Sequence, residues 1–161
     1  MFIKNIKLQN FRNYSYQELE FGKGINIIFG NNAQGKTNII EAIFICSMAK
    51  SFRAKRDKEL IKFNQPKAIV EIEYEKKDRV GKIKTEIEDK KIFFSNDVKQ
   101  IKISDIIGKV NTVIFTPDTI DIIKDNPETR RKFLNTRAYV VDGEAGYGHV
   151  LCYGYRYGCA G

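Results

Sequence analysis

The stretch "FGNNAQGKTNIIEAIF", residues 29–44, decides the fold of this 161-residue chain. Gly30 is followed by four residues of other types and then by Gly35, Lys36 and Thr37, which is the spacing of a P-loop that wraps the phosphates of a nucleotide. With ordinary amino-acid usage, a random chain of this length contains the pattern roughly once in a few hundred sequences. The pattern therefore predicts a nucleotide-binding site.

The sequence on either side of the loop predicts the strand and the helix that a P-loop requires. Residues 25–29, "INIIF", are a continuous apolar run rich in β-branched residues, which predicts a strand buried on both faces. The run that follows the loop, "TNIIEAIFICSMAK", leaves almost no polar stripe, so we expect a helix that is buried nearly all round. The start of this helix offers free N–H groups to an anion, and the glycines let phosphate approach the backbone closely.

The residue types in the loop assign roles toward a nucleotide and its metal ion. We expect the ammonium group of Lys36 to reach the β- and γ-phosphates and the hydroxyl group of Thr37 to coordinate Mg²⁺. The expected nucleotide-binding residues of this segment are Gly30, Asn31, Asn32, Ala33, Gln34, Gly35, Lys36, Thr37 and Asn38.

A P-loop alone does not make a hydrolase, because catalysis also requires a carboxylate at a strand end to complete the Mg²⁺ shell. Asp118 lies three residues after the apolar run 111–115, in an expected helix start. Asp142 follows only two valines. Neither suits the role, so we assign no catalytic residue and expect little or no hydrolysis.

Four other segments have the pattern of strands. Residues 2–9 alternate apolar and polar side chains, and residues 111–115 form a second buried apolar run. Within residues 68–94, two alternating stretches at 70–75 and 83–88 are separated by a polar turn, which predicts an antiparallel hairpin with one solvated face.

The net charge of +8 and the pI of about 9.3 predict contact with a polyanion, either a nucleotide or a nucleic acid. Four basic residues gather around one aromatic side chain after the helix, and these are the candidates for DNA contact: Lys50, Arg53, Lys55 and Arg56. A solvated charged face is the alternative for each of them.

Composition favours a cytoplasmic globular protein. The length suits one domain, and no apolar run reaches the roughly 18 residues that a membrane span needs. No secretory signal is evident at the start of the chain. Cys46, Cys152 and Cys159 lack metal-ligand spacing, and Cys46 sits in an apolar run typical of a buried reduced thiol.

The end of the chain differs from the rest. Residues 138–161 hold six of the twelve glycines and five of the eight tyrosines, without helical periodicity or clean strand alternation. We divide the chain into a half-domain at 1–137 and this anomalous tail. The tail is either sequence foreign to the fold, such as an altered reading frame, or a mobile glycine-rich extension.

Four stretches carry a family resemblance. "LQNFRNY", "GNNAQGKTNIIEAIF", "KSFR" and "FTPDTIDIIKDNPETRRKFLN" resemble the N-terminal half of the RecF family of bacterial recombination mediators, in the same order and at similar spacing. RecF is similar to the ATPase heads of structural-maintenance-of-chromosomes proteins. The resemblance implies an α/β fold: an ABC-type P-loop half-head with a mixed sheet, a buried P-loop helix and an antiparallel β subdomain.

The resemblance also implies cofactors, partners and further site residues. ATP and Mg²⁺ are the implied cofactors, and Arg12 and Asn13 match a segment that lines the nucleotide in related heads. The implied partners are DNA, single-stranded or gapped duplex, and recombination mediator proteins that load a recombinase. Full-length heads dimerise on ATP and carry a signature motif and a second acidic motif in their C-terminal half, and we find neither motif in this chain.

Two other functions remain open from the sequence. A small P-loop kinase would need a phosphoacceptor site and an arginine-rich lid, and the long insert at 68–94 argues against so compact an enzyme. A DNA-binding module with a vestigial nucleotide loop would not bind ATP even with Mg²⁺ present.

Overall fold

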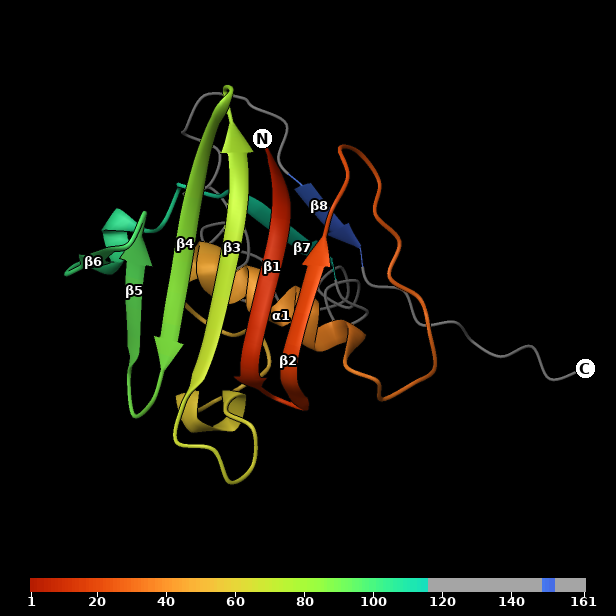
Figure 1. Ribbon diagram of the computed structural model, residues 1–161, viewed down its shortest axis with the longest axis vertical. Helices are drawn as coiled ribbons and strands as arrows, with labels where there is room; N and C mark the ends of the chain where they lie inside the picture. Colours follow the sequence, from red (N-terminus) through yellow and green to blue (C-terminus); the bar gives the residue numbers. More distant parts are fainter. Residues whose placement is uncertain (116–148, 153–161) are drawn as a thin grey trace, which may run out of the picture.

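The computed structural model describes residues 1–115 and 149–152, and its main feature is a six-stranded antiparallel sheet with the order β2-β1-β3-β4-β5-β6 (Figure 1). The sheet strands are β1 Phe2–Phe11, β2 Tyr14–Glu20, β3 Ala68–Lys76, β4 Arg79–Ile87, β5 Lys91–Ser95 and β6 Val98–Gln100. The other elements are α1 Lys36–Met48, the 3₁₀ helices η1 Asp57–Leu60 and η2 Ile103–Asp105, and the strands β7 Thr112–Phe115 and β8 His149–Cys152.

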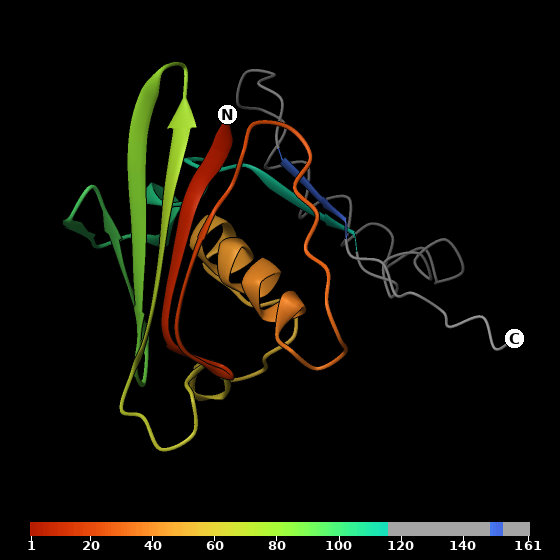
Figure 2. The same cartoon turned by 45° about the vertical axis from the view of Figure 1, so that its right-hand side comes forward.

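Helix α1 is the centre of the core. It lies between the antiparallel sheet and β7 (Figure 2), and it contacts β3 and β4 on one side and β7 on the other. Most of its apolar residues are buried, as the sequence predicts, whereas Phe44 and Met48 are half-buried. The buried ones are Ile39, Ile40, Ala42, Ile43, Ile45 and Cys46. Within the described ranges, neither α1 nor any other helix is long and apolar enough to cross a membrane.

The alternating strands behave as predicted. Side chains at alternate positions, such as Leu8, Ile72 and Ile83, are fully buried against α1, and their neighbours form charged pairs on the outer face. The β3–β4 hairpin turns through Lys77 and Asp78, which both have positive φ, as a tight primed turn requires. The predicted antiparallel insert is therefore confirmed.

The predicted strand at residues 25–29 is wrong. The segment belongs to an open connection that runs from β2 around α1 to the P-loop (Figure 2), and Ile25 and Phe29 are 93% and 88% exposed. A run of β-branched residues becomes a strand only where a neighbouring strand accepts from its N–H groups and donates to its C=O groups. In the part of the chain that the structure describes, β7 pairs with β8 instead, and Asn26 bonds back to Gly22.

The second correction concerns the tail, where the sequence pattern predicts no strand. Residues 149–152 form β8, which pairs in parallel with β7 and places His149 opposite Thr112. The expected helix starts after residue 115, and with them Asp118 and Asp142, lie outside the described residues. The interpretation of the tail as foreign or mobile sequence stays a prediction.

Candidate nucleotide site

The loop before α1 has the conformation of an anion-binding turn. Gly30, Ala33 and Gly35 have φ values of 145°, 63° and 98°, so the loop turns repeatedly through the left-handed half of conformational space. Gly35 is the N-cap of α1 and supplies no side-chain hydrogen bond, and the first turn contains no acidic residue. The N–H group of Asn38 donates to the carbonyl oxygen of Gly35 at 2.7 Å, so the N–H groups of Lys36 and Thr37 are the ones left for an external anion, which the positive end of the helix dipole also attracts.

The side chain of Lys36 folds back over the loop. Its Nζ atom donates hydrogen bonds to the carbonyl oxygens of Gly30, at 2.8 Å, and Asn31, at 2.6 Å. An ammonium group has three N–H donors, so one stays available while these two hold the loop closed. The hydroxyl group of Thr37 is partly exposed and makes no hydrogen bond to the described residues.

The β1–β2 turn packs directly against the loop. A Cβ atom at Gly35 would lie 2.7 Å from the hydroxyl oxygen of Tyr14 and 2.8 Å from Oδ1 of Asn13. The Tyr14 hydroxyl donates to the carbonyl oxygen of Gln34 at 3.3 Å, and burial raises the pKa of this phenol, which keeps it protonated as a donor. Asn38 donates to Asn13 at 2.8 Å, so the structure brings the predicted Asn13 to the site and adds Tyr14.

Arg12, the other residue that the resemblance assigns to the nucleotide, makes a different set of contacts. Its Nε and Nη2 atoms donate to the two carboxylate oxygens of Glu41 at 2.9 and 2.8 Å, and its Nη1 atom donates to the carbonyl oxygen of Glu59 at 2.8 Å. A guanidinium group has five N–H donors, so two remain. Contact between Arg12 and a nucleotide stays a prediction.

Glu41 is a site residue that our sequence reasoning missed. Its side chain is fully buried, and besides Arg12 it accepts a hydrogen bond of 2.5 Å from the Ser51 hydroxyl. The Ser51 oxygen in turn accepts from the backbone N–H groups of Arg53 and Ala54 at 2.9 and 2.8 Å. An acid inside an otherwise apolar buried helix must be paired, and that pattern could have identified Glu41 as the partner of a basic residue.

The basic segment, Lys50 to Arg56, lies next to this network. Arg53 donates to Oδ1 of Asn38 at 3.1 Å, which places it beside the start of α1. The side chains of Lys50, Lys55 and Arg56 are exposed and pair with no described residue. The structure therefore brings Arg53 to the candidate site and leaves the other three facing solvent.

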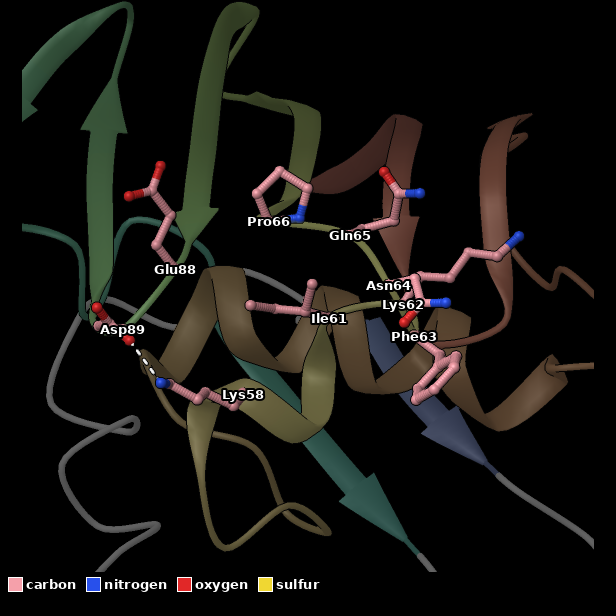
Figure 3. Close-up of a pocket in the computed structure, with 9 residues that line it drawn as sticks. All are labelled: Lys58, Ile61, Lys62, Phe63, Asn64, Gln65, Pro66, Glu88 and Asp89. Carbon is pink, nitrogen blue, oxygen red and sulfur yellow. Dashed lines mark ion pairs between the residues drawn. The ribbon is translucent and has the colours of Figure 1, made fainter.

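A separate pocket lies away from the P-loop. It has a volume of about 420 Å³ and is formed by the η1–β3 connection and the β4–β5 turn (Figure 3). Its rim carries the ion pair between Lys58 and Asp89, both well exposed, and the 87% exposed ring of Phe63. None of its lining residues belongs to the predicted site, so it adds nothing to nucleotide binding.

The described residues contain no group of three or more histidine, cysteine or acidic side chains that could hold a metal ion. Burial raises the pKa of the Cys46 thiol to about 12, and this thiol contacts Thr85 in the core. Cys46 is thus a buried, protonated thiol at neutral pH, as the sequence predicts.

Substitution of Gly35 tests the packing of the β1–β2 turn on the loop. Gly35→Ala combines a left-handed backbone with a clash against Tyr14 and Asn13, whereas Gly24→Ala has a similar φ, 95°, with no atom within 4 Å. We expect Gly35→Ala to reduce the free energy of unfolding by about 1–3 kcal/mol more than Gly24→Ala, because overpacking is added to equal backbone strain. Urea unfolding measures this difference, and equal losses would show that the loop does not pack on the turn.

Sequence comparison relates the chain to bacterial DNA-repair proteins. It is 45% identical over 144 residues to the DNA replication and repair protein RecF of Clostridium acetobutylicum, which covers 88% of this chain and 40% of that protein. It is 41% identical over 136 residues to the protein of the same name from Geobacillus kaustophilus, which covers 84% of this chain and 37% of that protein. The chain spans about two fifths of the length of these relatives.

Solved structures show the same relationship. A structure of the recombination mediator protein RecF-ATPrS in the RecFOR pathway matches with a TM-score of 0.80 and 39% identity, covering 88% of this chain and 39% of that one. A structure from a study of SMC ATPases matches with a TM-score of 0.69 at 24% identity, covering 84% of this chain and 99% of that one, and supports the fold alone. The resemblance to the N-terminal half of RecF and the ABC-type P-loop fold class are confirmed.

A family model described as an AAA domain matches residues 5–140, and the chain belongs to this family of AAA domain proteins.

Proposed function

We propose that this chain is the Mg²⁺-ATP-binding N-terminal part of a RecF-like DNA repair and recombination protein. The observation that carries the proposal is the loop at Gly30–Gly35, which leads into a helix start with no side-chain cap and no acid, with Lys36 folded over it. The names of two similar structures, RecF-ATPrS and RecF-ATP, add support for ATP as the nucleotide.

Different groups around the loop contact different parts of the nucleotide in this proposal. The N–H groups of the loop and of the first turn of α1 hold phosphate oxygens, and Lys36 exchanges its two carbonyl partners for the β- and γ-phosphates. Asn38 and Asn13 line the same end of the helix. Arg12 uses the N–H groups that Glu41 and Glu59 leave to it, so that the buried carboxylate orients the guanidinium group toward the nucleotide.

Thr37 is the residue that would hold Mg²⁺. Its hydroxyl group is part-exposed in the first turn of α1 and has no hydrogen-bond partner among the described residues, which is what a metal ligand at this position requires. When bound, the ion would neutralise charge on the phosphate oxygens.

We propose that the chain itself hydrolyses ATP little or not at all. No carboxylate among the described residues contacts Lys36 or Thr37. Glu41, one turn further along α1, has both oxygens engaged by Arg12 and Ser51. Neither the loop nor the first turns of α1 in the described structure thus supplies a free carboxylate to complete a Mg²⁺ shell or to orient water.

The wider role in DNA repair is also a proposal. The exposed charges of Lys50, Arg53, Lys55 and Arg56 would contact the phosphates of single-stranded or gapped duplex DNA in the cytoplasm. The full-length protein would dimerise on ATP and act with recombination mediator proteins to load a recombinase at gapped DNA. The printed names of the relatives, which combine DNA replication and repair with a RecFOR pathway, support this proposal.

Lys36→Ala tests nucleotide binding. We expect the affinity for Mg²⁺-ATP to fall by about two orders of magnitude, since charge-assisted hydrogen bonds to the terminal phosphates are lost. Isothermal titration measures the affinity, with Lys4→Ala on the outer face of the sheet as the control that keeps it. Unchanged affinity in Lys36→Ala would contradict the assignment, and robust phosphoryl transfer to a nucleoside by the unmodified chain would favour a kinase.

Thr37→Ala tests the metal contact. We expect the loss of ATP affinity to be several-fold larger with Mg²⁺ than with EDTA, because only the metal-bound nucleotide uses the hydroxyl group. Titrations under both conditions, with Thr37→Ser as the variant that keeps the hydroxyl group, make the comparison. Equal losses in Mg²⁺ and EDTA would remove Thr37 from the metal site.

The double variant Lys55→Ala/Arg56→Ala tests DNA contact. Each lost phosphate contact reduces the slope of log K against log salt concentration by about 0.9 on duplex DNA, so we expect a reduction of about 1.8. Fluorescence anisotropy at several salt concentrations measures the slope. Lys84→Ala, on the sheet face where Lys84 pairs with Glu86, is the matched control and should leave the slope unchanged. An unaltered slope in the double variant would exclude these side chains from the interface.

A further inference from the structure

Two residues of α1, about one helical turn apart, connect the same two loops. The outer connection runs through Asn38, which donates to Asn13 of the β1–β2 turn and accepts from Arg53 of the basic segment, at 2.8 and 3.1 Å. Asn13 and Arg53 are both exposed, so these hydrogen bonds lie at the surface beside the P-loop. Hydrogen bonds in this position exchange readily with water or with a ligand.

The inner connection runs through Glu41 and, unlike the outer one, is buried. The carboxylate is fully buried, with the side chain of Arg12 only 21% exposed, and the two form a bidentate pair. Ser51 donates to the same carboxylate. A buried pair of this kind does not exchange with solvent, because breaking it leaves a buried charge without compensation.

Glu41 therefore fixes the path of the basic segment relative to the P-loop helix. The oxygen of Ser51, held by Glu41, accepts the N–H groups of Arg53 and Ala54 and so sets the backbone where the basic segment begins. Thr37 lies four residues before Glu41, on the same face of α1. Glu41 thus stands between the start of the helix and two partners, the Arg12 turn and Ser51.

We propose that Glu41 is a positioning residue that couples occupancy of the P-loop to polyanion binding by the basic segment Lys50 to Arg56. The inference rests on the proposed function, since it requires that the chain bind both Mg²⁺-ATP and DNA. It adds that Glu41 touches neither ligand and acts through Arg12 on one side and Ser51 on the other.

The coupling is measured as a thermodynamic cycle on the full 161-residue chain. The affinity for Mg²⁺-ATP is determined with and without a gapped duplex oligonucleotide, and the affinity for the oligonucleotide with and without Mg²⁺-ATP. The two ratios must agree, because coupling between equilibrium binding sites is reciprocal. We expect a coupling factor of about fivefold or more for the unmodified chain, at the lower end of ordinary coupling.

Glu41→Gln keeps the shape of the side chain but leaves one oxygen to accept, and its amide group cannot accept from Arg12. We expect its coupling factor to fall to about 1. Glu71→Gln is the matched control, since Glu71 pairs with Lys82 on the opposite face of the sheet and should leave the coupling intact. Two variants of Ser51 serve as a second test if Glu41→Gln does not fold, because both retain the pair between Arg12 and Glu41. Ser51→Ala should lower the coupling factor, and Ser51→Thr, which keeps the hydroxyl group, should preserve it.

The outcomes separate the two proposals. Failure of the unmodified chain to bind Mg²⁺-ATP or DNA overturns the proposed function and the inference with it. Binding of both ligands without coupling overturns the inference alone. Equal weakening of both affinities in Glu41→Gln or Ser51→Ala, with the coupling factor unchanged, gives these residues a merely structural role and also overturns it.

Discussion

The bidentate pair between Arg12 and Glu41 is the interaction on which the arrangement of the site depends. A helix buried on every side has no solvated stripe for an acid, so Glu41 is tolerated only because a guanidinium group and a hydroxyl group meet it inside the protein. The pair ties the β1–β2 turn to α1, and through the carbonyl oxygen of Glu59 it ties in η1 as well. The β1–β2 turn, α1 and the segment at Ser51 are thus all held by the buried carboxylate of Glu41, beside the P-loop.

The sequence correctly predicts those elements whose structure follows from the pattern of residues within a single segment. The alternation in β1, β3 and β4, the hairpin turn at Lys77 and the all-round burial of α1 each follow from the periodicity within one segment. The P-loop conformation follows from the positions of its glycines. Two predictions are wrong because β-pairing is decided by distant segments that no local pattern specifies. The sequence predicts a strand at 25–29 that is absent, and it does not predict the strand at 149–152 that pairs with β7.

In the candidate site, too, local features are predicted from the sequence and long-range contacts are not. The residue types and spacing of Lys36 and Thr37 predict their positions at the start of α1, and the structure places them there. The packing of Tyr14 on the loop and the contact between Arg12 and Glu41 join residues 20 and 29 positions apart. Such contacts depend on the path of the chain, although the isolated acid in an apolar helix did signal a missing partner.

The charged outer face of the sheet has a consequence for the way a polyanion approaches the molecule. Several lysines there pair with carboxylates, as Lys7 does with Glu18 and Lys82 with Glu71, so at a distance the fields of these pairs largely cancel. The exposed charges of Lys50, Lys55 and Arg56 pair with no described carboxylate. Under the proposed function, this difference between paired and unpaired charges would favour encounters in which a polyanion meets the basic segment first.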